Sequence, residues 1–412
     1  MMLFYNLFIR TYSLLISLAS ITGNRKASAF IKGRKDWEKE LRAGTSHDAS
    51  PWVMFHCASL GEFEQGRPLI ESYRSKHPGE KILVSFFSPS GYELRKNYEG
   101  ADYVCYLPLD TARNAKTFIE IVQPSKVFFI KYEFWFNLLE ELHVRSIPHF
   151  VVSGIFRPSQ WIFKSINRSF LNRLSKIDYF FLQDNASVEL LACHGIRNTI
   201  ITGDTRFDRV VEVATKPAEL PEIENWCKTG SVIVAGSTWL EDEQALLGYM
   251  KQKNSDVKLL LVPHEINNNH LQRLEQEIGT TCPTCSFQLY SKTDGKIDSD
   301  ILIMDSIGLL SRLYRFATVA YVGGGFGSGI HNTLEAAVYG KPVVFGPRYE
   351  KFREAVDLIE KKAAFGCKTT HAVSDQLSTI LVSDSLITAA GNAAKAYVLS
   401  RTGATAKILE RL

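Results

Sequence analysis

The chain contains 412 residues, and a single hydrophobic core rarely grows beyond about 250–300 residues, so the length alone favours two domains. Hydrophobic residues make up 45% and charged residues 22% of the sequence, which excludes a largely disordered protein. The net charge of +4 is too small to argue for a nucleic-acid-binding protein, in which a clustered basic stripe is expected. It is compatible with an anionic membrane surface or an anionic substrate.

Residues Leu3–Ile21 form a mostly apolar run whose length approaches the roughly 20 residues that span a bilayer. Asn6 and Arg10 interrupt this run, and an arginine is costly in hydrocarbon. Positive charge keeps its flank of an apolar segment cytoplasmic, and basic residues follow at Arg25, Lys26, Lys32, Arg34 and Lys35. We predict a membrane-attachment helix and its basic flank over residues 1–40, either spanning the bilayer or lying in its surface. An ordinary buried N-terminal helix is the alternative.

The first half of the chain alternates short apolar runs with helical segments. It begins with a buried strand at Trp52–Cys57 and a helix at Glu62–Lys76. Further strands are predicted at Lys81–Phe87, Tyr103–Leu107, Lys126–Lys131, His149–Ser153 and Asp178–Gln183. Strands separated by helices indicate βαβ units and a parallel sheet.

The same pattern restarts in the second half, after Ile200–Gly203, the helical stretch Thr205–Val213 and a Pro- and Glu-rich linker candidate at Lys216–Glu224. A second series of strands is predicted at Ser231–Ala235, Lys258–Pro263, Ile301–Met304, Val319–Val322 and Pro342–Phe345. We predict an α/β protein of two doubly wound, Rossmann-like lobes, 41–212 and 213–412, facing a cleft. Ligands in such folds bind at the carboxyl ends of the strands, at a topological switch point.

Seven cysteines are scattered along the chain, and their odd number argues against a disulfide framework and for a reducing compartment. Cys282 and Cys285 form the one close pair. A zinc site would need a second pair of cysteines or two histidines at matching spacing. None follows, so we interpret this segment as a surface loop and predict no metal.

The segment Val319–Pro347 contains three consecutive glycines, Gly323, Gly324 and Gly325, and a helix is predicted to begin near Asn332. Glycines let the backbone approach a ligand, and the amides at a helix start favour an anion, so the segment predicts a phosphate cradle. It lacks the dinucleotide fingerprint and the Lys-Ser/Thr of a P-loop. Glu335 stands three residues after Asn332, so capping and ligand binding weigh equally for it.

Glu62 follows the strand Trp52–Cys57 and stands three residues after Ser59. This is capping-box spacing, and the spacing alone favours a capping role. The functional alternative is a general base at a strand end, because a sugar transfer needs a group that takes the proton from the attacking hydroxyl.

Polar residues also follow three other predicted strands. Glu133 suits either a site or the first turn of a helix. Ser237 and Thr238 could donate to a phosphate or carboxylate, or cap the helix behind them. His264 could contact a nucleotide, although a lone histidine is more often structural.

Taken in order, these segments resemble the Kdo transferases of lipopolysaccharide biosynthesis. That family of GT-B glycosyltransferases moves 3-deoxy-D-manno-octulosonic acid (Kdo) from CMP-Kdo to the lipid A precursor. The resemblance covers nearly the whole chain. It rests on Ser59-Leu-Gly-Glu62, Ser88-Pro-Ser-Gly91, Tyr106-Leu-Pro-Leu-Asp110, Glu133-Phe-Trp-Phe-Asn137, Thr202-Gly-Asp-Thr-Arg-Phe-Asp208, Gly236-Ser-Thr238, His331-Asn-Thr-Leu-Glu335, Gly340-Lys-Pro342 and Phe345-Gly-Pro347.

The resemblance implies a metal-independent, inverting transfer without a cofactor, in which Glu62 is the catalytic base and Glu133 lies on the acceptor side. It implies a CMP-Kdo site in the second lobe, with the last helix crossing back to the first lobe. The partners implied are CMP-Kdo, the lipid A precursor lipid IVA and the inner membrane, with the catalytic body cytoplasmic and no nucleic acid. The implied donor-binding residues are Ser237, Thr238, His264, Gly323, Gly324, Gly325, Asn332 and Glu335.

The chain departs from the family pattern at two places. Val262-Pro-His-Glu-Ile-Asn-Asn268 stands where the family has V-P-R-H-P-E-R, so the donor-side arginine is missing and His264 replaces it only in part. Ser153-Gly-Ile-Phe-Arg157 stands where the family has N-A-R-L-S, which puts the contacts to acceptor phosphates in doubt. The alternatives are another GT-B enzyme that uses a UDP-sugar, as a transferase or a UDP-GlcNAc epimerase-like protein, and a non-catalytic membrane-associated scaffold.

Overall fold

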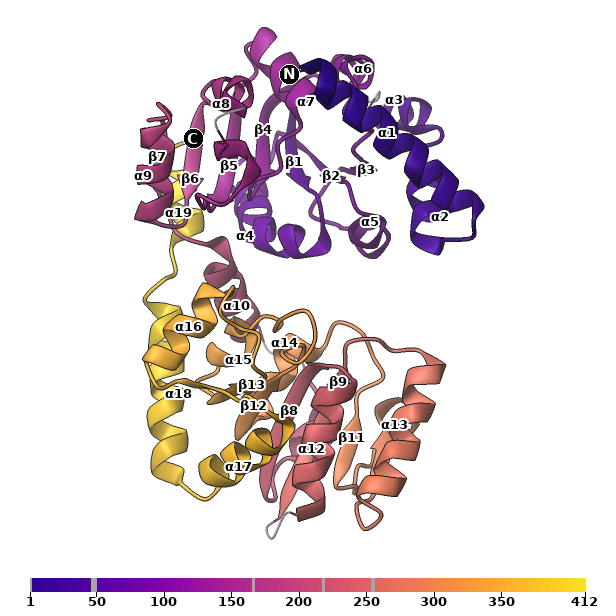
Figure 1. The fold of residues 1–412 in the computed structure, drawn as a ribbon, viewed down its shortest axis with the longest axis vertical. Helices are drawn as coiled ribbons and strands as arrows, with labels where there is room; N and C mark the ends of the chain where they lie inside the picture. Colours follow the sequence, from indigo (N-terminus) through magenta and orange to yellow (C-terminus); the bar gives the residue numbers. More distant parts are fainter. Residues whose placement is uncertain (1, 46–49, 165–166, 217–218, 253–255) are drawn as a thin grey trace. The chain divides into compact units, whose positions relative to one another are not determined.

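The structure, a computed structural model, describes residues 2–45, 50–164, 167–216, 219–252 and 256–412. The chain divides into two compact units (Figure 1): unit 1 is Met1–Arg209 with Thr402–Leu412, and unit 2 is Val210–Arg401. Each unit is built on a parallel sheet of seven strands, so the predicted fold class of two doubly wound α/β lobes is confirmed. Of the predicted linker, residues 217–218 lie outside the described residues.

The sheet of unit 1 has the strand order β3-β2-β1-β4-β5-β6-β7. The order reverses between β1 and β4, which makes the carboxyl ends of these two strands the switch point. The strands are β1 (Trp52–Cys57), β2 (Lys81–Phe86), β3 (Tyr103–Tyr106), β4 (Pro124–Ile130), β5 (His149–Gly154), β6 (Tyr179–Leu182) and β7 (Thr199–Ile201).

Helices cover both faces of this sheet, and the alternation of side chains along β1 shows why. Val53, Phe55 and Cys57 belong to one buried cluster, whereas Trp52 and Met54 belong to the other. The helices are α1 (Met2–Ile21), α2 (Arg25–Lys32), α3 (Trp37–Thr45), α4 (Leu60–Lys76), α5 (Pro89–Arg95), α6 (Ala112–Val122), α7 (Phe136–Val144), η1 (Trp161–Phe163), α8 (Arg168–Leu174), α9 (Asn185–Cys193), α10 (Thr205–Thr215) and α19 (Ala404–Leu409).

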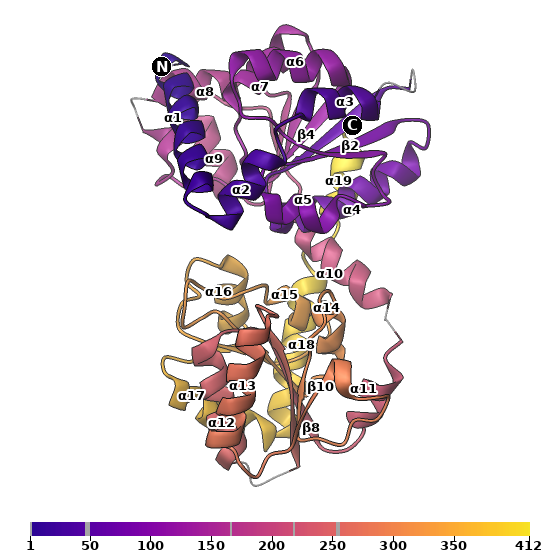
Figure 2. The ribbon, with the colours of Figure 1, turned by 90° about the vertical axis from the view of Figure 1, so that its right-hand side faces the viewer.

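The sheet of unit 2 has the order β10-β11-β9-β8-β12-β13-β14, which reverses between β8 and β12. The strands are β8 (Ser231–Thr238), β9 (Val257–Pro263), β10 (Phe287–Leu289), β11 (Ile301–Ile303), β12 (Val319–Val322), β13 (Val343–Phe345) and β14 (Ala364–Gly366). Figure 2 shows α12, α13 and α17 together on one side of this sheet, where their apolar residues form one buried cluster. The helices are α11 (Pro221–Trp226), α12 (Leu240–Gln252), α13 (Asn268–Thr281), η3 (Tyr290–Lys292), α14 (Leu310–Leu313), η4 (Tyr314–Phe316), α15 (Leu334–Ala337), α16 (Arg353–Glu360), α17 (Thr370–Leu381) and α18 (Asp384–Leu399).

The segment of Cys282 and Cys285 differs from the surface loop that the sequence suggested. Cys282 follows α13 directly and is fully buried in the core of unit 2. A turn in which the Cys285 N–H donates to the Cys282 carbonyl (2.9 Å) brings the two residues together, and their sulfurs are joined in a disulfide. The interpretation is confirmed for Pro283 and Thr284, which are exposed in the turn, and is wrong for Cys282, because the C-terminal end of an amphipathic helix buries it.

Helix α1 is the one helix of the described residues that is long and apolar enough to cross a membrane. It contacts unit 1 through Tyr5, whose ring packs edge-on against Phe136 of α7 and Phe170 of α8. The side chains of Leu3, Phe4, Leu7 and Phe8 are 61% to 85% exposed. The helix therefore has one face on the protein and an apolar face that the protein does not cover.

Helix α19 returns the chain to unit 1, where Asp208 of α10 caps it. The Asp208 carboxylate accepts the backbone N–H groups of Gly403 (2.6 Å) and Thr405 (2.7 Å), and Ile408 is buried in the cluster behind α4. Hydrogen bonds to a charged acceptor stabilise more than neutral ones do.

We expect Asp208→Ala to lower the free energy of unfolding of unit 1 by about 1–3 kcal/mol, because both N–H groups lose their acceptor. Urea denaturation followed by circular dichroism measures the change. Asp208→Asn retains one acceptor oxygen and should lose about half as much. An unchanged unfolding midpoint in Asp208→Ala would contradict this role.

Candidate active site

Glu62 lies at the start of α4, directly after the carboxyl end of β1. Its Oε2 accepts the N–H of Ala58 (2.6 Å), and the Ser59 Oγ accepts the N–H of Glu62 (3.4 Å), so the capping arrangement that the spacing suggested is present. The side chain is 8% exposed. Burial raises the pKa of Glu62, and the positive charge of Lys131 acts in the opposite direction. The residue therefore caps α4 and is also a buried carboxylate at the switch point.

Glu133 follows the neighbouring strand, β4, in the loop before α7. Burial and the negative charge of Glu62 raise the pKa of Glu133 to about 8, while Lys131 lowers it. Lys131 has a left-handed backbone (φ 70°), a conformation that non-glycine residues rarely adopt and that often marks a functional site. The two glutamates thus form an interacting pair on which the charge of Lys131 also acts, and at neutral pH the pair retains a proton.

His56, at the end of β1, fixes the loop that carries Glu133. Its Nε2 accepts the indole N–H of Trp135 (2.8 Å), and its Nδ1 lies 2.8 Å from the Ser85 Oγ. Burial lowers the pKa of His56 to about 3, so the ring is neutral and its Nδ1–H donates to Ser85. Trp135 also packs on Phe87, with ring centroids 4.5 Å apart.

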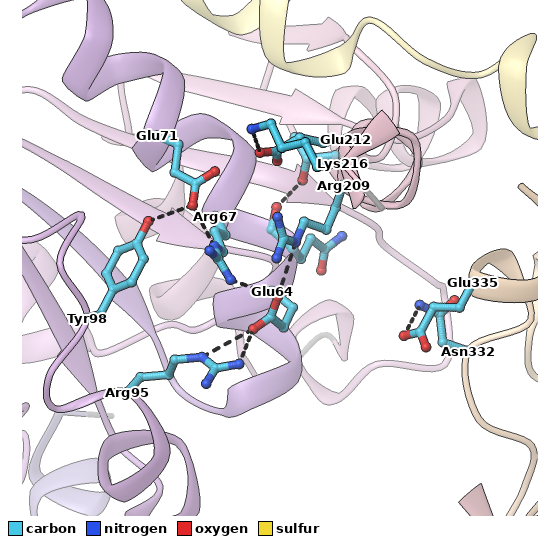
Figure 3. Close-up of polar contacts among 12 residues, drawn as sticks. Glu64, Arg67, Glu71, Arg95, Tyr98, Arg209, Glu212, Lys216, Asn332 and Glu335 are labelled. Atoms are coloured by element: carbon cyan, nitrogen blue, oxygen red, sulfur yellow. Dashed lines mark hydrogen bonds and ion pairs between the residues drawn. The ribbon is translucent and has the colours of Figure 1, made fainter. Parts of the chain in front are cut away.

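Glu64, one turn into α4, forms ion pairs with three arginine side chains (Figure 3). Arg95 reaches it at 2.7 Å, Arg209 of α10 at 3.2 Å and Arg67 at 4.0 Å. Gln65 adds a hydrogen bond to Asp204 (2.8 Å). These contacts fix the orientation of α4, and hence of Glu62, against the start of α10 within unit 1.

In unit 2, the three consecutive glycines follow β12 at the second switch point. A Cβ on Gly323 would lie 2.3 Å from the carbonyl oxygen of Ser237, and one on Gly325 would lie 2.6 Å from the Cα of Gly346. Gly324 has φ +90°. Glycine is required here because backbone segments pack against one another. From the sequence we expected only the close approach of a ligand.

Asp242 of α12 holds this glycine loop in place. The carboxylate is fully buried and accepts the N–H groups of Gly324 (2.8 Å) and Trp239 (3.0 Å) and the hydroxyl of Tyr321 (2.6 Å). Asp242 was not among the predicted site residues, because its partners lie as far away as 82 residues along the chain.

Ser237 and Thr238 end β8 beside the glycine loop. Ser237 has a left-handed backbone (φ 54°) and is partly buried. The Thr238 hydroxyl donates to Glu243 (3.2 Å) and the residue is fully buried. Glu243 also contacts His270 (2.8 Å) and Arg273 (2.7 Å), so Thr238 belongs to a buried polar cluster.

Asn332 and Glu335 lie together in unit 2 (Figure 3). The side-chain N–H of Asn332 donates to Glu335 Oε1 (3.1 Å), and its Oδ1 accepts the N–H of Leu334 (3.2 Å). The helix expected to begin near Asn332 is α15, a single turn that starts at Leu334. A single turn carries little macrodipole, so its contribution to anion binding is smaller than the sequence suggested.

His264, after β9, belongs to a stack of rings with Trp239 (4.7 Å between centroids) and His331 (4.5 Å). The Trp239 indole N–H donates to His331 Nε2 (3.3 Å), so the His331 Nδ1 carries the hydrogen. Burial and the neighbouring His264 lower the pKa of His331 to about 4, which makes this ring neutral. The stack lies where the family pattern leads one to expect an arginine.

The candidate residues therefore gather at two switch points, Glu62 and Glu133 in unit 1 and the donor candidates in unit 2. Lys131, His56, Trp239 and His331 were not among the predicted site residues. These residues lie near the ends of strands, so a strand prediction could have pointed to them. In the described part of the chain, no group of three or more His, Cys, Asp or Glu side chains could hold a metal ion.

Comparison with known proteins shows which family this chain resembles. Residues 35–209 match the profile of the 3-deoxy-D-manno-octulosonic-acid transferase (kdotransferase) family. The chain is 27% identical to 3-deoxy-D-manno-octulosonic acid transferase of Aquifex aeolicus, over 80% of this chain and 85% of that protein. It is 25% identical to the transferase of the same name from Haemophilus influenzae, over 87% and 86%.

Among solved structures, UDP-GlcNAc 2-epimerase of Neisseria meningitidis superposes with a TM-score of 0.61 at 15% identity, over 88% of this chain and 98% of that one. MurG of Acinetobacter baumannii gives a TM-score of 0.53 at 12% identity, over 88% and 98%. With its two parallel-sheet lobes, the chain is a glycosyltransferase of GT-B architecture. Within that class, residues 35–209 match the Kdo transferase domain, and most of the chain is similar to Kdo transferases.

The coupled pair of glutamates has a measurable pH signature. With its carboxyl carbons labelled by ¹³C, the protein should show a glutamate resonance that titrates at about pH 8, and this titration should vanish in Glu133→Gln. In Glu62→Gln the pKa of Glu133 should fall, because a neighbouring negative charge is removed, and stay above 4.5, because burial remains. An unchanged pKa in Glu62→Gln would refute the coupling.

The same shift sets the sign of a stability change. Between about pH 4.5 and 8, Glu133 is protonated in the folded protein and ionised in the unfolded chain. Its contribution to the free energy of unfolding therefore becomes less favourable as pH rises through that window. The free energy of unfolding of Glu133→Gln should therefore fall less steeply between these pH values than that of the wild type.

Proposed function

We propose that this protein transfers Kdo from CMP-Kdo to the lipid A precursor lipid IVA, a step of lipopolysaccharide biosynthesis. The observation that carries the proposal is the coupled pair Glu62 and Glu133 at the switch point of unit 1, within the residues that match the Kdo transferase profile. A buried carboxylate of raised pKa beside a second carboxylate suits proton transfer near neutral pH.

The proposed chemistry is a metal-independent inverting displacement. A hydroxyl oxygen of the acceptor glucosamine forms the bond to the anomeric carbon of Kdo, while the bond from that carbon to the CMP phosphate breaks and CMP leaves with the electron pair. Glu62 takes the hydroxyl proton. Its Oε2 accepts the N–H of Ala58, which orients the carboxylate and leaves lone pairs of Oε1 for that proton. Glu133, holding a proton, donates a hydrogen bond on the acceptor side.

The proposed donor site is the second switch point. Ser237, His264, Asn332 and Glu335 would contact the nucleotide, and the glycine loop Gly323–Gly325 would hold the backbone close to the phosphate. Thr238 would act through Glu243, to which its hydroxyl donates a hydrogen bond. His331 is neutral, and its Nδ1–H can donate to an oxygen of the nucleotide or of the sugar acid. The transfer needs no cofactor.

We further propose attachment to the inner membrane through α1, with the catalytic body on the cytoplasmic side. The support is the exposed apolar face of α1 and the basic residues that follow it.

Two substitutions separate the catalytic role of Glu62 from its capping role. Glu62→Gln keeps an oxygen that accepts the Ala58 N–H but cannot take a proton, so the transfer rate should fall at least 100-fold, the scale of general-base catalysis, with stability and donor affinity little changed. Ser59→Ala removes the other half of the cap, so it should lower stability by about 1 kcal/mol and leave the rate within a few-fold.

The assay is mass analysis of lipid IVA after incubation with CMP-Kdo. A Glu62→Gln enzyme of near-normal turnover would remove Glu62 from the role of base. Absence of any Kdo-bearing product with the wild-type enzyme would refute the proposed function, and tolerance to substitution at both Glu62 and Glu335 would favour the non-catalytic scaffold.

The second candidate is an enzyme that acts on a UDP-sugar, because the solved structures that resemble this fold include UDP-GlcNAc 2-epimerases. Calorimetric titration decides between the nucleotides. We expect CMP to bind at least ten times more tightly than UDP. The reverse order would favour the UDP-sugar enzyme.

A further inference from the structure

Helix α1 contacts residues that follow three strands of unit 1, namely β2, β3 and β4. Tyr12 contacts Phe87, which follows β2, with ring centroids 6.4 Å apart. Tyr5 contacts Asp110, beyond β3, and Asn6 contacts Asn137, beyond β4. Figure 1 shows α1 passing beside α7 on its way to α2. The helix that carries the exposed apolar face therefore also touches the sheet edge where Glu62 and Glu133 lie.

Asp110 joins α1 to the start of α7. The Tyr5 hydroxyl donates to Asp110 Oδ2 (2.6 Å), and the carboxylate also accepts the N–H groups of Asn137 (2.9 Å) and Leu138 (2.9 Å). The residue at the N-cap position of α7 is Trp135, whose side chain makes no capping bond. Asp110, from a different loop, therefore supplies the missing cap, and it is 3% exposed.

Asn137 makes a second link to α1. Its side-chain N–H groups donate to Asn6 Oδ1 (2.9 Å) and to the Asp110 carbonyl (2.5 Å). Glu133 lies in the short loop between the end of β4 and Phe136, the first residue of α7. The position of Glu133 thus depends on where α7 begins, and α7 begins where Asp110, Tyr5 and Asn6 hold it.

We propose that α1 is part of the framework of the acceptor site: Tyr5, acting through Asp110, is a positioning residue for Glu133, and seating the apolar face of α1 in a lipid bilayer orders the Glu133 loop. The bilayer is the occupant because the exposed side chains Leu3, Phe4, Leu7 and Phe8 form an apolar face, and the exposed Arg10 at its edge suits the headgroup layer. The link to the acceptor rests on the proposed function, whereas the link from α1 to the loop rests on the contacts alone.

The test compares Tyr5→Phe with Tyr12→Phe in the full chain. Tyr5→Phe removes the hydroxyl that donates to Asp110 and keeps the ring that packs on Phe136. Tyr12→Phe is the matched control, because it removes a hydroxyl from the same helix and keeps the ring contacts with Phe30 and Phe87. Hydrogen exchange of residues 133–139 is measured with and without vesicles of phosphatidylethanolamine and phosphatidylglycerol.

We expect vesicles to slow the exchange of this segment in the wild type and in Tyr12→Phe. In Tyr5→Phe the exchange should be about tenfold faster, the effect of one lost hydrogen bond to a charged group, and the protection by vesicles should be weakened. Exchange that is the same in Tyr5→Phe as in the wild type would overturn the positioning role. Exchange that vesicles leave unchanged in the wild type would overturn the role of the bilayer.

An activity measurement separates positioning from a general structural effect. Tyr5→Phe should raise KM for lipid IVA several-fold and leave the affinity for CMP unchanged, because only the acceptor loop is disturbed. Equal losses in both would indicate a structural effect and overturn the assignment. If the protein transfers no Kdo, the proposed function fails, but the exchange measurement still decides whether α1 orders the loop.

Discussion

Buried carboxylates that accept backbone N–H groups at the carboxyl edges of the sheets hold the loops of this protein. Glu62 accepts from Ala58, Asp110 from the first turn of α7, and Asp242 from the glycine loop. A strand-to-helix turn leaves N–H groups without partners, and burying them unpaired costs about 1–3 kcal/mol each. A carboxylate satisfies two at once, and its charge near a helix start is favourable. The same edges are where a doubly wound sheet binds ligands.

This constraint explains how the capping role of Glu62 and the catalytic role proposed for it are compatible at one position. The cap holds one carboxylate oxygen in a fixed direction, and burial raises the pKa of the Glu62 carboxyl. A base that must contact a substrate hydroxyl in one geometry benefits from both effects. A carboxylate that is already oriented needs no further ordering during the reaction. Capping, which the structure shows, therefore does not exclude the proposed catalysis at Glu62.

The sequence predicted the long strands well, because runs such as Trp52–Cys57 are apolar on both faces. It missed β10 and β14, since three-residue edge strands carry too little pattern to detect. Glu62 and Glu133 could be chosen as candidates because each comes within a few residues of the end of a predicted strand. Asp110 and Asp242 could not be assigned their roles, because their partners lie 27 and 82 residues away and only the folded chain brings them together. The burial of Cys282 was not predicted either, since it depends on how α13 packs.

The return of the chain to unit 1 at α19 has a consequence for the order of events during synthesis. Ile408 is buried in the core behind α4, the helix whose first turn contains Glu62, and Asp208 accepts the N–H groups of Gly403 and Thr405. The ribosome adds roughly 5–20 residues per second, and domains that are continuous in sequence fold as they emerge. Unit 1 is discontinuous, so its last core position and its cap stay open until all of unit 2 has been made. The nascent protein thus completes the lobe that carries Glu62 last, although that lobe is translated first.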